Sequence, residues 1–196
     1  MLSFKNSLQV LKKTRALLEG HFILSSGLHS TNYVQCAKLL SNPTDSIKFT
    51  KSLSKKITKK FKKIDLILSP AMGGVIIGYE VGKQLKKEAI FCERVKKKFK
   101  LRRGFVIRPK SNVLIVEDVI TTGKSSLECT ELVKKYDSKV IGFACLIDRR
   151  NSKKKKLNKM EVVSQIKLQI PTFKRNKIPR DLKKIPAVKP GSRNLR

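Results

Sequence analysis

Two adjacent carboxylates, Glu117 and Asp118, stand directly before a hydroxyl-rich run within the stretch Val113–Ser126. The run is Thr121–Ser125, TTGKS in one-letter code. Hydroxyl groups and the free backbone N–H groups at the start of a helix bind phosphate, whereas carboxylates accept hydrogen bonds from vicinal hydroxyls such as those of a ribose. Gly123 allows the backbone to approach a phosphate closely. The stretch therefore predicts a site that holds a sugar phosphate at both ends.

A strand and a helix must position these groups. Val113–Val116 is a β-branched-rich apolar run, which is typical of a strand buried on both faces of a parallel sheet. After the turn, helical spacing is kept by the apolar residues Leu127, Cys129, Leu132, Val133 and Tyr136. The acids are thus expected at the end of the strand, and the hydroxyl-rich turn is expected to open the helix.

Two other interpretations fit parts of this stretch. A Walker-type phosphate loop also contains Gly-Lys-Ser, but it requires a second glycine at the position of Asp118. That interpretation fails. An ordinary buried strand and capped helix, with acids that only face solvent, also satisfies the local pattern and stays open.

The composition limits the class of protein. A chain of 196 residues fits one domain, which is large enough to bury a hydrophobic core without disulfide bonds or structural metals. No apolar run is long enough to span a membrane. The four cysteines lack CxxC spacing, so we expect reduced core residues in a cytoplasmic protein and no zinc site. These cysteines are Cys36, Cys92, Cys129 and Cys145.

The formal net charge of +32 raises the hypothesis of nucleic-acid binding. The excess is mostly lysine spread along the whole chain, with runs at Lys96–Lys98 and Lys153–Lys156 and few aromatic residues between them. A general bias toward lysine gives the same count without any such function. No specific nucleic-acid partner is therefore expected, although the positive electrostatic field of the protein would attract anionic substrates.

The amino-terminal part predicts a helix and then a ring-binding loop. Phe4–Leu18 has an amphipathic stripe, which Gly20 would end; an organelle transit peptide is the alternative. The next residues are rich in serine and glycine, and Tyr33 offers a surface on which a flat ring can stack. The candidate lining residues are Ser25, Ser26, Gly27, Ser30 and Tyr33. The nearby His21 and His29 are expected to be structural.

The middle of the chain repeats the order strand, loop, helix. After a basic helix over Pro43–Phe61, a buried strand at Ile64–Leu68 leads through Ser69–Gly74 into a helix over Val75–Lys86. Glycines at fourfold spacing in this helix, Gly74 to Gly82, favour close packing. In a parallel sheet, this loop and the hydroxyl-rich turn meet at the same carboxyl edge.

Three more features could serve such a site. A short strand at Ile90–Cys92 runs into a cationic hairpin, Glu93–Gly104, which would neutralise charge as a lid or would simply be a solvated turn. A buried strand at Val140–Ile147 ends near Arg149, whose guanidinium can grip a carboxylate with two hydrogen bonds. A last strand is expected at Val162–Ile170, and the remaining residues to Arg196 are basic without periodicity.

These segments resemble a known family. The motif VLIVEDVITTGKS resembles the phosphoribosyl-diphosphate (PRPP) motif of the type I phosphoribosyltransferases. The segment GHFILSSGLHSTNYVQC, the frame ER…LRRGF and the ending KPGSR are similar to the short-loop bacterial branch of the orotate phosphoribosyltransferases. The Arg-Lys-x-x-Lys-x-His pattern of the other branch is missing, so the resemblance does not identify the catalytic lysine.

The resemblance implies one α/β domain over residues 1–196 with the type I phosphoribosyltransferase fold, which has a mostly parallel central sheet flanked by helices and a small amino-terminal hood. The hood and orotate loop would occupy residues 1–40, the PRPP-binding core 60–150 and a basic tail 171–196.

The resemblance also implies site residues. PRPP would bind to Glu117, Asp118, Val119, Ile120, Thr121, Thr122, Gly123, Lys124 and Ser125. Orotate would contact Ser26, Gly27, Tyr33, Thr121 and Arg149. The catalytic candidates are Asp118, Arg94, Lys97 and Lys98. The Mg²⁺ cofactor would be held mainly by the diphosphate of PRPP, without a protein metal site.

The implied reaction transfers the phosphoribosyl group of PRPP to orotate, which gives orotidine 5′-phosphate and diphosphate in pyrimidine biosynthesis, in a cytoplasmic homodimer with shared active sites. Two alternatives stay open at this point. A purine could replace orotate on the same fold, or the fold could serve a nucleic-acid-binding regulator.

Overall fold

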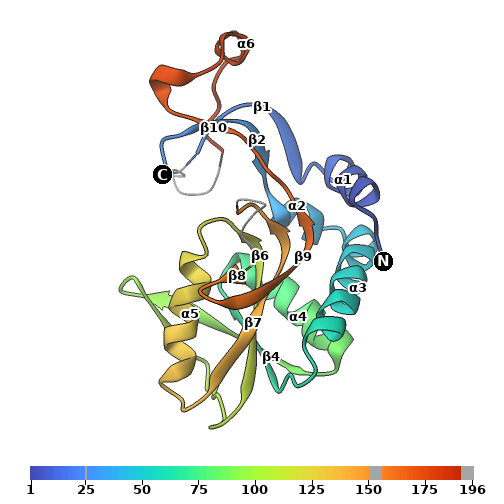
Figure 1. The fold of residues 1–196 in the computed structure, drawn as a ribbon, viewed down its shortest axis with the longest axis vertical. Helices are drawn as coiled ribbons and strands as arrows, with labels where there is room; N and C mark the ends of the chain where they lie inside the picture. The colour runs from blue at the N-terminus through green and yellow to red at the C-terminus, as the bar shows by residue number, and fades with distance from the viewer. Residues whose placement is uncertain (25, 151–155, 191–196) are drawn as a thin grey trace.

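The structure, a computed structural model, describes residues 1–24, 26–150 and 156–190. Ser25, which was predicted to line the ring loop, lies outside these residues, as do most of the Lys153–Lys156 run and the end of the KPGSR segment. The described chain forms a central sheet covered by helices, with a smaller sheet above it (Figure 1). We call this smaller sheet, formed by residues 17–23, 29–34 and 172–173, the hood.

The central sheet has the strand order β5-β4-β3-β6-β7-β9-β8. Its five inner strands, from β4 to β9 in this order, run parallel, and the two edge strands pair antiparallel. The strands are β3 (Leu66–Pro70), β4 (Glu88–Val95), β5 (Lys98–Leu101), β6 (Asn112–Ile120), β7 (Lys139–Asp148), β8 (Lys156–Leu157) and β9 (Met160–Lys167). The mostly parallel sheet confirms the predicted fold class.

Side chains along β6 alternate between two cores, because successive residues of a strand point to opposite faces. Leu114 and Val116 pack in the core that α3 (Pro43–Lys60) and α4 (Gly73–Leu85) cover, whereas Val113 and Ile115 pack toward α5 (Lys124–Lys134). Figure 1 shows α5 on one side of the sheet and α3 and α4 on the other. The continuous apolar run of β6 therefore reflects burial on both faces, as predicted.

The predicted strand at Val113–Val116 is longer than expected. It continues through both acids to Ile120, because β7 runs alongside it as far as the pair Ile120↔Asp148. The acids therefore lie inside the last residues of a hydrogen-bonded strand instead of beyond it. A backbone held by a neighbouring strand fixes their side chains more firmly than a loop does.

The hood contains strands from both ends of the described chain. Its antiparallel strands are β1 (Leu17–Ile23), β2 (His29–Val34) and β10 (Thr172–Phe173), and it also carries η1 (Arg175–Lys177) and α6 (Arg180–Lys183). Val188 adds backbone hydrogen bonds of 2.8 Å to His21 O and from Ile23 N. The division into an amino-terminal hood and a separate carboxyl-terminal tail is thus incomplete, since residues 172–188 of the predicted tail belong to the hood.

The predicted helix over Phe4–Leu18 is wrong in its last five residues, 14–18. Helix α1 (Phe4–Lys13) ends at Thr14, and Arg15 takes a left-handed conformation with φ 55°. Leu17 and Leu18 begin β1, where pairing with β2 overrides their helical spacing. Gly20 accordingly lies in a strand, where the register shifts between Glu19 and Phe22.

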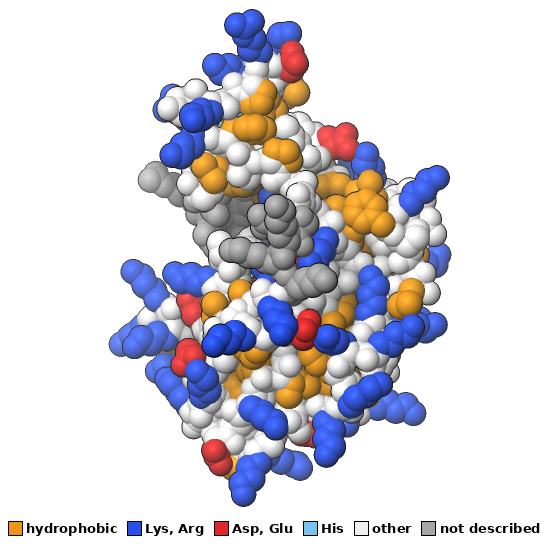
Figure 2. Space-filling view, viewed as in Figure 1, with side chains coloured by type: hydrophobic (Ala, Val, Ile, Leu, Met, Phe, Trp, Pro, Cys, Tyr) orange, Lys and Arg blue, Asp and Glu red, His pale blue; other side chains and the backbone are white. Residues whose placement is uncertain are grey.

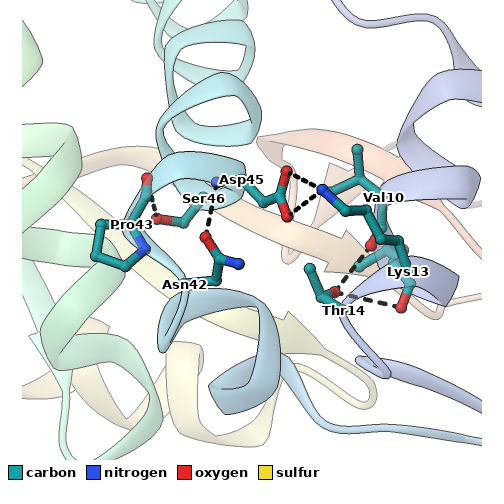
Figure 3. Close-up of polar contacts among 8 residues, drawn as sticks. Val10, Lys13, Thr14, Asn42, Pro43, Asp45 and Ser46 are labelled. Atoms are coloured by element: carbon teal, nitrogen blue, oxygen red, sulfur yellow. Dashed lines mark hydrogen bonds and ion pairs between the residues drawn. The ribbon is translucent and has the colours of Figure 1, made fainter.

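Polar contacts join α1 to α3 where the chain turns back from the short helix α2 (Cys36–Leu40). Lys13 Nζ forms an ion pair with the buried carboxylate of Asp45 at 3.0 Å, and Asn42 Oδ1 accepts a 3.1 Å hydrogen bond from Asp45 N as the cap of α3 (Figure 3). Pro43 occupies the first turn, where no N–H partner is needed. These contacts explain why α3 begins where the sequence predicts.

Close packing of α4 depends on its glycines. A Cβ atom on Gly78 would lie 2.1 Å from Ser69 Oγ, and one on Gly82 would lie 2.6 Å from Ala89 Cβ. No real side chain tolerates such contacts, so α4 lies against β3 and β4 because these positions lack a side chain. The prediction of close helix packing is confirmed. None of the helices in the described part of the chain is long and apolar enough to cross a membrane.

Candidate active site

The candidate site lies at the carboxyl edge of the parallel strands. The ends of β3, β6 and β7 meet there, followed by the loop into α4, the turn into α5 and Arg149. In open parallel sheets this edge is the usual place for ligands, because neighbouring loops splay apart there. Most predicted site residues therefore lie at one edge of the sheet. They follow parallel strands directly in the sequence, and the carboxyl ends of parallel strands share an edge.

Glu117 is buried beneath α5. Glu117 is 8% exposed, and its Oε1 accepts a hydrogen bond from Ser126 Oγ. Burial raises the pKa of Glu117 to about 7, the Ser126 hydrogen bond opposes that rise, and the adjacent Asp118 adds to it. Glu117 therefore has one oxygen committed to the protein and Oε2 left for a ligand hydroxyl.

Asp118 points from β6 toward the start of α4. Its Oδ1 accepts a 2.8 Å hydrogen bond from Val119 N, and burial raises the pKa of its carboxyl group. A Cβ atom on Gly73 would lie 2.7 Å from Asp118 Oδ2. Gly73 therefore leaves the space in which this carboxylate lies, a role that the sequence pattern did not assign to it.

The predicted phosphate cradle is the turn between β6 and α5. Thr121, Thr122 and Lys124 are exposed, and Gly123 caps the helix with φ 80°. The first turn of α5 contains no acid, and its N-cap residue Gly123 has no side chain to cap it, although Thr122 Oγ1 accepts from Lys124 N at 3.3 Å. The remaining N–H groups of this turn and the positive end of the helix dipole are available to an anion.

The other residues predicted for this cradle follow the same turn. Val119 is half-buried and Ile120 is buried at the end of β6, and Ser125 is half-buried in the first turn of α5. The left-handed backbone angle favours glycine at position 123, and a Cβ atom there would lie 2.6 Å from the terminal methyl groups of Leu157, which would have to move.

Arg149 follows β7 and faces the hood. Its backbone N donates to Ile120 O at 2.8 Å, and its Nε is buried with no hydrogen-bond partner among the described residues. Burial lowers the pKa of Arg149, and Tyr33 lies close enough to oppose this shift. By contrast, the neighbouring Arg150 is fully committed to Asp148 through Nε and Nη2 at 3.0 and 2.9 Å. Of these two arginines, Arg149 is the one with a free donor.

The predicted ring loop lies in the hood. Tyr33 is half-buried on β2 with its ring centroid 5.8 Å from that of Phe22, and Ser26 and Gly27 are exposed at the tip between β1 and β2. Gly27 has φ 78°, a conformation that favours glycine. The structure thus brings Tyr33 near Arg149 and leaves Ser26 and Gly27 open to solvent.

The cationic segment forms the predicted hairpin from β4 and β5. Its two-residue turn, Lys96–Lys97, has positive φ at both positions, which is the geometry of a tight hairpin. Arg94 forms an ion pair with Glu128 of α5 and lies 4.1 Å from the centre of the Phe99 ring. The three catalytic candidates of this hairpin, Arg94, Lys97 and Lys98, are all exposed, and Arg94 is held against its own chain by these two contacts.

The remaining polar candidates have structural contacts. His21 Nε2 and His29 Nδ1 are 2.7 Å apart, and His21 Nδ1 lies 2.9 Å from Ile185 O. All four cysteines are buried and free, as expected. Within residues 1–24, 26–150 and 156–190, no three His, Cys, Asp or Glu side chains gather closely enough to hold a metal ion.

Replacing Glu117 with glutamine is expected to stabilise the protein at alkaline pH. The carboxyl pKa rises from 4.5 to about 7 on folding, so its stabilising contribution is complete below about pH 4.5 and is lost as the pH rises through about 7. The amide carries no charge and still accepts from Ser126. We expect the variant to gain on the order of 1–3 kcal/mol at pH 8 and little at pH 5.

Urea unfolding at the two pH values measures this difference. The matched control is Glu131→Gln, which removes an exposed charge from α5. A gain for Glu117→Gln that is equal at both pH values would contradict the assigned burial effect.

The chain is similar to known proteins over almost its whole length. Residues 37–177 match the family model described as the phosphoribosyl transferase domain. The chain is 44% identical over 187 residues to an orotate phosphoribosyltransferase of Erythrobacter litoralis, with 95% of this chain and 96% of that protein covered. It is 46% identical over 189 residues to an orotate phosphoribosyltransferase of Rhizorhabdus wittichii, with 94% and 95% covered.

Solved structures agree on the fold. The orotate phosphoribosyltransferase of Aeropyrum pernix superposes with a TM-score of 0.67 at 24% identity, covering 82% of this chain and 92% of that one. The adenine phosphoribosyltransferase of Thermoanaerobacter pseudethanolicus gives a TM-score of 0.59 at 19% identity, covering 70% and 88%. The fold is therefore shared by proteins named for different bases, and structural likeness alone does not select the base.

Proposed function

This chain belongs to the orotate phosphoribosyltransferase family, and we propose on that premise that it transfers the 5-phosphoribosyl group of PRPP to orotate in pyrimidine biosynthesis. The products would be orotidine 5′-phosphate and diphosphate. The chain is 44% and 46% identical, over nearly its full length, to two proteins named orotate phosphoribosyltransferase, which supports orotate over a purine as the base.

The observation that carries the proposal is the placement of two acids one turn away from an open helix end. Glu117 and Asp118 lie in the last residues of β6, which ends at Ile120, and the first turn of α5 begins at Lys124 and contains no acid. The 5′-phosphate of PRPP would accept from the N–H and hydroxyl groups of Thr121–Ser125, while the acids would accept from the ribose hydroxyls. Held at both ends, the ribose would present its anomeric carbon to the base.

Bond breaking at that carbon would leave positive charge on the ribose and negative charge on the diphosphate. The carboxylate of Asp118 would stabilise the first charge. Lys97 and Lys98, exposed on the β4–β5 hairpin, are candidates to stabilise the second. Arg94 lies close enough to Glu117 for their charges to interact, which supports a placement of the hairpin base next to the acids.

Orotate differs from uracil by a carboxylate. The free Nε of Arg149, buried beside Tyr33, suits such a group because a guanidinium can donate two parallel hydrogen bonds to it. Ser26 and Gly27 would cover the other side of the ring.

The acids do not form a metal site. Ser126 and Val119 N each take one oxygen of Glu117 and Asp118, and the remaining oxygens are assigned to ribose hydroxyls, so a magnesium ion would be held by the PRPP diphosphate. When bound, Mg²⁺ would neutralise charge on the leaving diphosphate. The protein residues would still orient the ribose and the base.

We also propose that the protein acts as a cytoplasmic homodimer with shared active sites. One face of α4 and the residue before it expose apolar side chains at spacing i, i+4 and i+7, namely Met72 (85%), Ile76 (50%) and Tyr79 (63%). A contiguous apolar stripe of this kind is a typical protein–protein contact. The buried free cysteines are consistent with a reducing compartment.

Replacing Ile76 with glutamate is expected to convert the homodimer into monomers, because it places a charge in the middle of the apolar stripe. Size-exclusion chromatography with light scattering measures the mass. Ile47→Glu is the control, since Ile47 is also an exposed isoleucine (37%) but lies on α3. Equal masses for wild type and Ile76→Glu would remove this face from the interface.

Base selectivity tests the proposed function. The loss of orotate would be followed by its absorbance with PRPP and Mg²⁺ present, and hypoxanthine, adenine and uracil would serve as comparison substrates. We expect the highest kcat/KM for orotate. Turnover of a purine without turnover of orotate would overturn the assignment.

The lysine excess favours no second function. Figure 2 shows lysine and arginine side chains spread over the visible face of both the hood and the core, without a gathered patch. A loose affinity for any polyanion follows from such a surface, and sequence-selective binding does not.

A further inference from the structure

Ser126 joins the two halves of the candidate site. Its side chain is fully buried in the first turn of α5, directly after Ser125 of the phosphate cradle, and its hydroxyl donates to Glu117 Oε1 near the end of β6. Its own backbone carbonyl accepts from Thr130 Oγ1, one turn further along α5, at 3.1 Å. The contact thus connects the helix expected to hold the phosphate with an acid expected to hold the ribose.

The charges around Glu117 make this hydrogen bond important. Asp118 on the same strand and Glu128 on α5 both disfavour an ionised Glu117, and the thiols of Cys129 and Cys145 face it from α5 and β7. Among the described residues, the cation Arg94 on β4 acts on it in the opposite direction. Because Arg94 is itself paired with Glu128, the Ser126 hydroxyl is the main local group that stabilises the carboxylate.

We propose that Ser126 is a positioning residue for phosphoribosyl transfer: its hydroxyl holds the Glu117 carboxylate ionised and oriented, so that Glu117 Oε2 can accept a hydrogen bond from a ribose hydroxyl of PRPP. This inference rests on the proposed function. A neutral Glu117 would offer a donor where the ribose hydroxyl also needs to donate, and PRPP would bind less tightly.

The test is the pH dependence of kcat/KM for PRPP in the wild type and in Ser126→Ala, from about pH 6 to about pH 9. In the wild type, kcat/KM is expected to rise with pH as Glu117, with its pKa of about 7, loses its proton. Without the hydroxyl, this rise should move upward by about 1 pH unit, because the charged form loses its donor. At pH values below the rise, kcat/KM for PRPP should be about 10-fold lower in the variant than in the wild type. Above the rise, the two values should be close.

A second readout separates positioning from general damage. The KM for PRPP should rise in Ser126→Ala at neutral pH, while the KM for orotate should stay unchanged. Ser126→Thr keeps the hydroxyl and should retain the wild-type profile. The matched control is Ser46→Ala on α3, which removes another buried hydroxyl, one that donates to Pro43 O at 3.2 Å, and should not move the profile.

An unshifted pH profile in Ser126→Ala, with activity lowered equally at every pH, would overturn the proposal. If the alanine variant does not fold, Ser126→Cys substitutes a weak donor of similar size, and the proposal then requires its rise to lie at higher pH than that of the wild type. Absence of orotate turnover in the wild type would instead refute the proposed function, so the two failures are distinguishable.

Discussion

Asp118→Asn is expected to lower kcat by about 100- to 1000-fold while the fold is retained. The carboxylate lies against Gly73 at the end of β6 and would accept from a ribose hydroxyl while it stabilises positive charge on the ribose. Asparagine removes that charge and replaces one acceptor oxygen with a donor. Its remaining oxygen can still accept from Val119 N, so the backbone contact that Asp118 makes at 2.8 Å survives.

Circular dichroism and steady-state kinetics with PRPP and orotate together check this expectation. Glu131→Gln serves as the control, because it removes an acid that is 68% exposed on α5 and should leave kcat unchanged. Near-normal turnover by a folded Asp118→Asn protein would show that the ribose-binding role has been assigned to the wrong acid.

Arg149→Ala is expected to lower kcat/KM for orotate by about 100-fold or more, since one partner of a partly buried charge pair would be lost. The variant should also lose its preference for orotate over uracil, because uracil lacks the carboxylate that Arg149 would hold. The backbone hydrogen bond from Arg149 N to Ile120 O does not depend on the side chain, so the end of β7 should stay in place.

Parallel kinetics with orotate and uracil measure the change in preference. Arg149→Lys keeps the charge without the planar fork and should fall between the wild type and the alanine variant. Arg175→Ala removes an exposed arginine from η1 of the hood and is the control for loss of charge. An Arg149→Ala protein that still prefers orotate by the wild-type factor would exclude Arg149 from carboxylate recognition.

The sequence predicted the central sheet well because its strands are buried on both faces. Val113–Val116 and Val140–Ile147 are continuous apolar runs, and both became inner parallel strands. The acids and the hydroxyl-rich turn follow one of these strands directly, so their position at the carboxyl edge needed no information from distant parts of the chain.

The hood was predicted less well because its contacts are non-local. Leu17 and Leu18 fit both a helix and a strand, and pairing with β2 decides between them. Thr172–Phe173 and Val188 join the hood through backbone hydrogen bonds, which leave no side-chain pattern in the sequence. The composition of residues 171–196 therefore gave no sign that this segment returns to β1 and β2.

Within the site, the missed features depend on three-dimensional contacts. Gly73 matters because Asp118 from another strand fills the space beside it, and Ser126 matters because it reaches back to Glu117. Gly73 and Asp118 are far apart in the sequence. Glu117 and Ser126 belong to one stretch, but the sequence does not show which of its hydroxyls reaches the acid. Arg149 and Arg150 look equivalent in the sequence, and the pairing of Arg150 with Asp148 distinguishes them.

The most direct test of the central claim follows the ribose itself. PRPP labelled in its ribose would be incubated with orotate, Mg²⁺ and either the wild-type protein or Asp118→Asn. For the wild type, we predict that the label appears in orotidine 5′-phosphate, in equal amount to the diphosphate released, and that the variant forms far less of both. Label that stays in PRPP, or that passes only to water as ribose 5-phosphate, would contradict the account.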